Sequence, residues 1–400
     1  MSPRFALREL GPFQAGARAG CKAILVADVS DFYPSLYTHS IPWTFHTKAV
    51  AKSNRSNALF GNRLDQLVRN SQDGQTMGVP IGPDTSFIIA EAVLAAVDRA
   101  CAKKIKPLRG IRWVDGYELT FAERSRAEDA LAVIQEALFD FELRVNPRKT
   151  SIADLPAEFE QEWVSELRAF NFRKSARGQA NDLFRYFDFI TRYLSGSENE
   201  HIVKYGIARL RTFPIHANNS ELFQSLLCQA VAFEPGAIRE AVEALYYAQT
   251  HHNLAVNHRL LEATLNTIIE QSASVGHDYE VSWCLWAALC WAVSISRKAA
   301  AAISQMENSV VAILALHASQ QGLIPQGLQT TGWQARMTTA DLYEEQWLLA
   351  YEANAQGWLP SIGPDHVNAD PSFGFLKNLG VRFYIPTQNP LVPGALVYPP

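Results

Sequence analysis

The chain of 400 residues lacks the features that mark membrane, secreted and zinc-binding proteins. No apolar run is long enough to cross a bilayer, and no apolar signal core stands at the N-terminus. The five cysteines form no CxxC pair, and no Cys/His cluster has the spacing of zinc ligands. We therefore expect buried free thiols, no membrane partner and a cytoplasmic location.

Charged residues are also sparse, at 19%, and they are unevenly distributed. Residues 1–150 hold 20 Lys and Arg against 16 Asp and Glu, a balance of +4. The other residues hold 16 against 24, a balance of −8. A basic first part suits a nucleic-acid or nucleotide partner, although chance variation explains so small an excess equally well.

Residues 1–155 mix strand and helix patterns. They predict a buried strand over 23–28, a mostly buried helix over 87–98, a hairpin over 111–121 that turns at Asp115-Gly116, and an amphipathic helix over 127–143. The only polar residues of the helix 87–98, Glu91 and Asp98, are seven apart and share one face. This order of elements predicts an α+β domain with an antiparallel sheet.

From about residue 180 onward, one helical pattern follows another. Helices are predicted over 200–212, 220–232, 236–249, 256–272, 279–297, 298–320 and 338–355, without a strict repeat period. Paired helices of this length predict an all-α, HEAT-like or solenoid-like domain over 156–355. The last segment, 356–400, is rich in Pro and Gly and has one predicted helix or strand at 371–384.

Two of the predicted strands end on an aspartate, Asp28 and Asp115. Mg²⁺ (or Mn²⁺) takes oxygen ligands and few protein groups, and two such ions serve nucleotidyl transfer. The pair therefore predicts the metal site of a palm-type polymerase that consumes dNTPs. Taken singly, each aspartate is equally well explained as a turn or helix-capping residue.

The residues around this pair predict contacts to substrate. Tyr33 follows Asp28 by five residues, and its ring either excludes a 2′-hydroxyl or packs in the core. Lys149 either meets the pyrophosphate and donates a proton or is a solvated surface lysine. Ser86 is also suited to cap the helix that follows it. The predicted template and nucleotide contacts lie in one loop and comprise Gln75, Gly78, Pro80, Gly82 and Ser86.

In order and spacing, these segments resemble motifs A, B, C and D of reverse transcriptases. Residues 31–43 (DFYPSLYTHSIPW) and the closing run 373–384 are similar to the prokaryotic abortive-infection reverse transcriptases of the AbiK type. The resemblance implies a palm followed by a HEAT-like helical domain, with Asp28 and Asp115 as metal ligands. It implies that Tyr33 is the sugar gate, that 75–86 contacts template and nucleotide, and that Lys149 is the motif D lysine.

The same resemblance implies DNA synthesis in anti-phage defence, in some members without a template and primed on protein. DNA or RNA would then be bound, and a homo-oligomer is compatible with this reading. Two departures keep an alternative open. Motif C normally carries two adjacent aspartates, and Gly116 stands at the second position. Motif A starts only 28 residues into the chain, so the fingers subdomain is largely missing.

These departures support an alternative function, a catalytically inactive palm remnant that binds nucleic acid or serves assembly. The short upstream segment indicates either a start further upstream or a remnant of a longer ancestor. A two-metal nuclease is disfavoured, because such sites usually gather more carboxylates than this sequence places together.

Overall fold

The computed structural model describes residues 7–194, 202–211 and 213–386, so the end of the predicted C-terminal segment, 387–400, lies outside the described residues. The chain divides into two compact units, Met1–Glu160 and Gln161–Pro400, and each has its own apolar core. The first unit mixes helix and sheet, and the second is helical. No helix in the described ranges is both long and apolar enough to cross a membrane.

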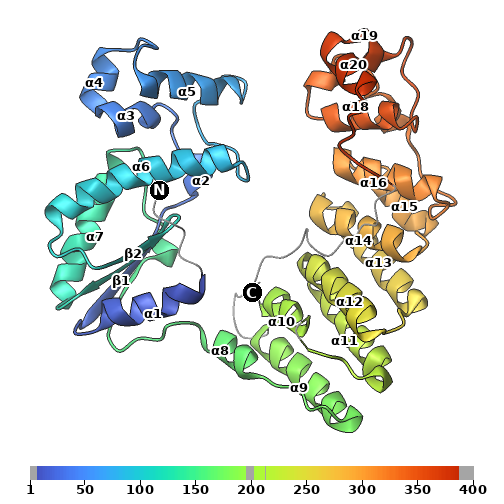
Figure 1. Ribbon diagram of the computed structural model, residues 1–400, viewed down its shortest axis with the longest axis horizontal. Helices are drawn as coiled ribbons and strands as arrows, with labels where there is room; N and C mark the ends of the chain where they lie inside the picture. The colour runs from blue at the N-terminus through green and yellow to red at the C-terminus, as the bar shows by residue number, and fades with distance from the viewer. Residues whose placement is uncertain (1–6, 195–201, 212, 387–400) are drawn as a thin grey trace. The chain divides into compact units, whose positions relative to one another are not determined.

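The first unit is built on a four-stranded antiparallel sheet (Figure 1). Its spatial order is β2-β3-β1-β4. The strands are β1 (Ala23–Asp28), β2 (Gly110–Trp113), β3 (Gly116–Phe121) and β4 (Ser151–Asp154). The predicted strand 23–28 and the antiparallel sheet are confirmed, and Asp28 lies opposite Gly116 in the register of β1 and β3.

The β2–β3 hairpin turns one residue earlier than the sequence predicts. Trp113 pairs with Gly116, which leaves Val114 and Asp115 as the two turn residues. Gly116 pairs with both neighbouring strands, so it belongs to the strand and not to the turn. Val114 instead takes the positive φ, +53°, which costs an L-residue about 1–2 kcal/mol.

Helices cover both faces of this sheet. Alternate side chains of β1 and β3 are buried against α6 (Asp84–Lys104) and α7 (Arg124–Phe139), which correspond to the predicted helices 87–98 and 127–143. The opposite face carries α1 (Leu7–Arg18), where Gln14 and Arg18 donate to Glu118 at 2.7 and 3.2 Å. Between β1 and α6 lie α2 (Phe32–Ser35), α3 (Ser40–His46), α4 (Lys48–Ser53) and α5 (Phe60–Asn70).

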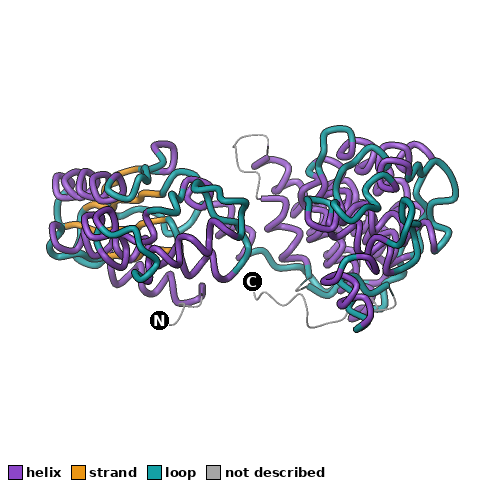
Figure 2. The backbone as a smooth tube through the Cα atoms, turned by 90° about the horizontal axis from the view of Figure 1, so that it is seen from above, coloured by secondary structure: helices purple, strands orange, loops and turns teal. Residues whose placement is uncertain are grey.

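The second unit begins with α8 (Glu162–Ala169) and continues as two rows of helices (Figure 1). Its described residues form helices and loops without a strand (Figure 2). In one row each member packs on the next: α10 (Ile202–Leu210), α12 (Ile238–His252), α14 (Asp278–Trp291), α16 (Ser309–Gln320) and α18 (Trp347–Ala355). The other row is α9 (Ala176–Leu194), α11 (Ser220–Phe233), α13 (His258–Ala273) and α15 (Arg297–Ile303). Shared nearest-neighbour packing of this kind builds one continuous core along the array.

Helix ends in the second unit differ from the predicted ones where local capping intervenes. The predicted helix 298–320 is two helices, because the Asn308 side chain accepts two backbone N–H groups and starts α16. The predicted helix 279–297 ends at Ala292, which has a left-handed φ of 49°. The helix predicted over 338–355 begins only at residue 347. After α18, the chain forms α19 (His366–Ala369) and α20 (Pro371–Asn378), so the element predicted at 371–384 is a helix.

All five cysteines are free thiols, as the sequence predicts. Cys101 and Cys284 are buried, whereas the other three are only half-buried, so the expectation of burial holds for two. Burial raises the pKa of Cys101 to about 11 and that of Cys290 to about 12. These two thiols are therefore protonated at neutral pH and are poor nucleophiles.

Candidate active site

Asp28 and Asp115 meet where β1 ends and the β2–β3 hairpin turns. The Val29 N–H donates to the Asp115 carbonyl at 3.2 Å, which fixes the turn beside the end of β1. Asp28 keeps 19% of its side chain exposed, so the carboxylate is accessible to solutes. Two aspartates that are 87 residues apart in the chain therefore share one edge of the sheet because the two strands are antiparallel neighbours.

Lys149 reaches the same edge because residues 145–154 run back along β1. Val145 pairs with Val29, and β4 then pairs with the first four residues of β1. This return places the Lys149 ammonium 3.8 Å from an Asp28 carboxylate oxygen. The Lys149 side chain is 68% exposed, so it can move toward a bound anion.

Asn146 also belongs to this site, although its sequence context predicts no role for it there. Its backbone N–H donates to the Asp28 carbonyl at 2.7 Å, and its amide donates to the Asp28 carboxylate at 3.5 Å. The same side chain accepts the Arg148 N–H and starts the short turn that carries Lys149. Asn146 thus orients both charged groups. The sequence feature that could have identified Asn146 is the following Pro147, because an Asn-Pro pair favours the start of a turn.

The charges at this edge are coupled. Burial raises the pKa of Asp115, and the negative charge of Asp28 raises it further. The charges of Lys149 and Arg112 act in the opposite direction but do not cancel the rise. Repulsion between the two carboxylates means that a cation bound between them would be favoured.

A partly buried ion network supports the strained turn. Arg112 donates to Glu91 at 3.0 and 3.1 Å, to Asp98 at 2.9 Å, and to the Val114 carbonyl at 2.5 Å. Burial acts to lower the pKa of Arg112, but Glu91 and Asp98 outweigh it and raise that pKa. The shared face of Glu91 and Asp98 was visible in the sequence, whereas their partner was not.

The loop predicted to contact template and nucleotide lies against the segment that follows β1. The Gly78 N–H donates to the Leu36 carbonyl at 2.9 Å, and the Val79 N–H donates to the Tyr33 carbonyl at 3.0 Å. The Thr38 backbone N–H donates to the Thr76 carbonyl at 2.9 Å, beside these two bonds. The loop and Tyr33 are therefore neighbours.

Gly78 and Gly82 both occupy the left-handed region, with φ of +81° and +117°. A Cβ at Gly78 would also lie 3.0 Å from the Pro34 carbonyl oxygen, so only glycine allows the loop to approach this closely. Gln75, Pro80 and Gly82 are exposed. Their exposure leaves the outer side of the loop accessible to a ligand.

Two residues of the predicted set are placed differently from the rest. Ser86 is buried inside α6, and that helix begins after Pro83 without a side-chain cap, so the prediction that Ser86 caps it is wrong. Tyr33 is half-buried and packs against the core of the first unit, with its ring 5.4 Å from that of Phe32. The ring of Tyr33 therefore packs against the core, which is one of the two expected roles. A sugar-gate role would use the part of the ring that remains exposed.

The donor set at the strand ends fits Mg²⁺. Asp28 and Asp115 supply carboxylate oxygens, and no sulfur or imidazole lies among the residues assigned to the site. Within the described residues, no group of three or more His, Cys, Asp and Glu side chains is arranged so that it could hold a metal ion. The protein would therefore provide two carboxylates and leave the other coordination positions to water and phosphate oxygens.

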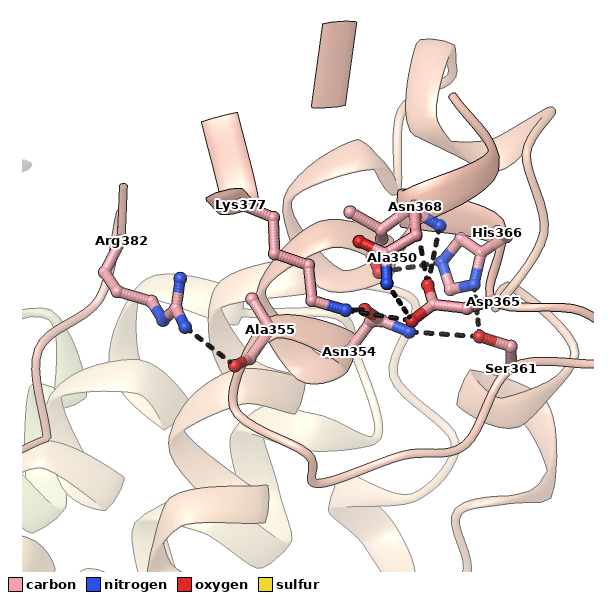
Figure 3. Close-up of polar contacts among 10 residues, drawn as sticks. Ala350, Asn354, Ala355, Ser361, Asp365, His366, Asn368, Lys377 and Arg382 are labelled. Atoms are coloured by element: carbon pink, nitrogen blue, oxygen red, sulfur yellow. Dashed lines mark hydrogen bonds and ion pairs between the residues drawn. The ribbon is translucent and has the colours of Figure 1, made fainter. Parts of the chain in front are cut away.

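A second polar cluster lies at the C-terminal end of the helical unit (Figure 3). The His366 ring contacts the Ser361 hydroxyl at 2.8 Å and the Ala350 carbonyl at 3.0 Å. Asp365 caps α19 and accepts from Lys377 at 3.0 Å. Each of these groups has a hydrogen-bond partner, and Lys377 also donates to Asn354, so the cluster ties residues 361–377 to α18.

No protein-family model matches this chain, and no curated protein matches it either.

Proposed function

We propose that the chain is a reverse-transcriptase-type DNA polymerase that transfers nucleotides from dNTPs. The observation that carries the proposal is the meeting of Asp28, Asp115 and Lys149 at one sheet edge. It is supported by the strained Val114 turn, since backbone strain held in place by surrounding structure, here a partly buried ion network, is typical of functional sites. On the resemblance of its motifs, we assign the protein to abortive-infection defence against phage, with a palm and a HEAT-like domain.

The residues of the chain divide the work of nucleotidyl transfer. Asp28 and Asp115 would hold Mg²⁺ (or Mn²⁺), which when bound supplies charge neutralisation and a more acidic attacking hydroxyl. Lys149 would bind the anionic pyrophosphate or give it a proton. Tyr33 would exclude the 2′-hydroxyl of a ribonucleotide, and the backbone of the 75–82 loop would position the nucleotide.

The test is the incorporation of labelled dNTPs by the purified 400-residue chain, with Mg²⁺ or Mn²⁺, with and without a primer-template. We expect Asp28→Asn and Asp115→Asn each to reduce incorporation by at least about a hundredfold. Asp31→Asn is the matched control, because Asp31 is exposed on the same segment and Asn tolerates its left-handed φ of 42°. Incorporation that survives Asp28→Asn would refute the assignment.

Gly116 favours a second candidate function, that of a catalytically inactive palm remnant that binds nucleic acid or serves assembly. The residue opposite Asp28 carries no carboxylate, so the site has one ligand fewer than the motif it resembles. This candidate predicts no incorporation by the folded chain and binding of DNA or RNA that Asp28→Asn leaves unchanged. A gel-shift titration of both proteins distinguishes the two candidates.

A further inference from the structure

A second charged site lies at the opposite end of the same sheet. An open cavity of about 180 Å³ is lined by the segment just before β1, the end of β3, the connection from α6 to β2, and one side of α7. Ala23 pairs with Phe121 at this end, whereas Asp28 pairs with Gly116 at the other. Five residue steps along a strand separate the two ends by roughly 17 Å.

Cations line this cavity. Lys104, Lys106, Arg109 and Arg126 face it, against a single carboxylate, Asp129. Lys104 is paired with Glu136 at 2.6 Å. Among the described residues, none of the other three cations forms an ion pair. With Lys104 paired to Glu136, three cations face one carboxylate in the lining, which leaves a surplus of two positive charges.

The two arginines are oriented by uncharged groups. Arg109 donates to the Cys21 sulfur at 3.8 Å and to the Gly16 carbonyl at 3.4 Å. Arg126 donates to the Lys106 carbonyl at 3.1 Å. These bonds fix each guanidinium at the cavity while leaving most of its N–H donors for another acceptor. Guanidinium forks match phosphate oxygens in geometry and in charge.

We propose that this cavity binds the phosphate group of a small phosphorylated molecule, at a site separate from Asp28 and Asp115. The volume equals about six times the share of one water molecule in the liquid, which suits a phosphate with a small attached group. Lys106, Arg109 and Arg126 would neutralise the phosphate charge. Phosphate binding at this cavity requires no catalytic activity of the chain, so this proposal does not depend on whether the chain is a polymerase.

Calorimetric titration of the full chain with inorganic phosphate tests the proposal, in EDTA and without divalent metal. We expect Arg109→Gln and Arg126→Gln each to weaken phosphate binding about tenfold, because each removes charged hydrogen bonds. Lys103→Gln is the matched control, since Lys103 is an exposed cation on α6 outside the cavity lining. Lys149→Gln is the second control and reports any binding at the other end of the sheet.

Unchanged phosphate affinity in both arginine variants, or an equal loss in Lys103→Gln, would overturn the proposal. If a glutamine variant is unfolded by circular dichroism, Arg109→Lys and Arg126→Lys keep the charge and are expected to lose affinity by a smaller factor. Glycerol 3-phosphate and a 5′-phosphorylated tetranucleotide distinguish the sources of the phosphate. Tighter binding of the tetranucleotide, lost in the arginine variants, would overturn the assignment to a small molecule.

Discussion

Gly116 lies directly across from Asp28, and cross-strand partners in an antiparallel pair place their side chains on the same face. A Cβ at this position would meet only the Trp113 carbonyl oxygen, at an ordinary contact distance of 3.6 Å. The fold therefore accepts a side chain there, and the missing carboxylate is a chemical change rather than a steric requirement.

Gly116→Asp is expected to change the free energy of unfolding by less than about 1 kcal/mol in EDTA. It should raise Mg²⁺ affinity about tenfold, because a third carboxylate joins the site and ligand charge sets the affinity for hard cations. Calorimetric titration with Mg²⁺ measures this change. Gly332→Asp adds the same charge in the second unit, where a Cβ meets nothing within 4 Å. Equal Mg²⁺ affinity in both variants would contradict the placement of the metal beside Asp28.

Gly78 carries two separate requirements, its φ of +81° and its approach to Pro34. Gly74 has nearly the same φ, +75°, but a Cβ there has open space. We expect Gly74→Ala to cost about 1 kcal/mol and Gly78→Ala about 2–3 kcal/mol, measured by urea unfolding. The difference between the two variants reports the approach of the loop to the segment after β1. Equal costs would mean that the loop moves away freely.

At the scale of elements, the sequence predicted what depends on local pattern. The strand 23–28 follows from a short continuous apolar run and the helices of the second unit from helical apolar spacing, and both are properties of neighbouring residues. The turn at Val114 and Asp115 was misplaced because pairing with β1 draws Gly116 into the strand, against the local preference for Asp-Gly turns. Asn146 was missed for the same reason, since its partner is 118 residues away.

Arg112 connects three elements, because it extends from β2 to two carboxylates of α6 and to the hairpin turn. Its side chain is 11% exposed, while those of Glu91 and Asp98 are each 35% exposed. Arg112→Met is expected to cost about 3 kcal/mol of unfolding free energy, since it leaves two partly buried carboxylates without a cationic partner, although Asp98 keeps its hydrogen bond from the Tyr117 hydroxyl. It should also reduce dNTP incorporation, because the turn that carries Asp115 loses its support.

Arg124→Met provides the comparison for this network. Arg124 pairs with Glu128 and Asp154 on the same unit, but it is 50% exposed. Solvent screening limits its expected cost to less than about 1 kcal/mol. Urea unfolding of both variants measures the difference. If Arg112→Met costs no more than Arg124→Met, the network does not hold the hairpin in place.

At the scale of the whole molecule, the division into two compact units with separate apolar cores predicts two unfolding events. The sequence indicated this division through the change from mixed patterns to successive helices. It did not indicate which buried polar groups stabilise each unit. One such group in the second unit is the Asp182 carboxylate, whose side chain is 5% exposed. It accepts from the Arg173 guanidinium at 2.7 Å and from the Arg173 backbone N–H at 2.8 Å.

The hydrogen bonds from Arg173 hold the pKa of Asp182 below its ordinary value, against the opposing effect of burial. A carboxyl whose pKa is lower in the folded state stabilises the fold above its unfolded pKa of about 4 and loses that contribution as the pH falls further. Asp182→Asn should therefore lower the transition temperature of the second unit at pH 7, measured by calorimetry, and leave that of the first unit unchanged. The gap between wild type and variant should close as the pH falls below about 4. Asp188→Asn, an exposed change on the same helix, should shift neither transition. A gap as wide at pH 3 as at pH 7 would contradict the role of the Asp182 charge, because that contribution is lost as the pH falls toward the lowered pKa.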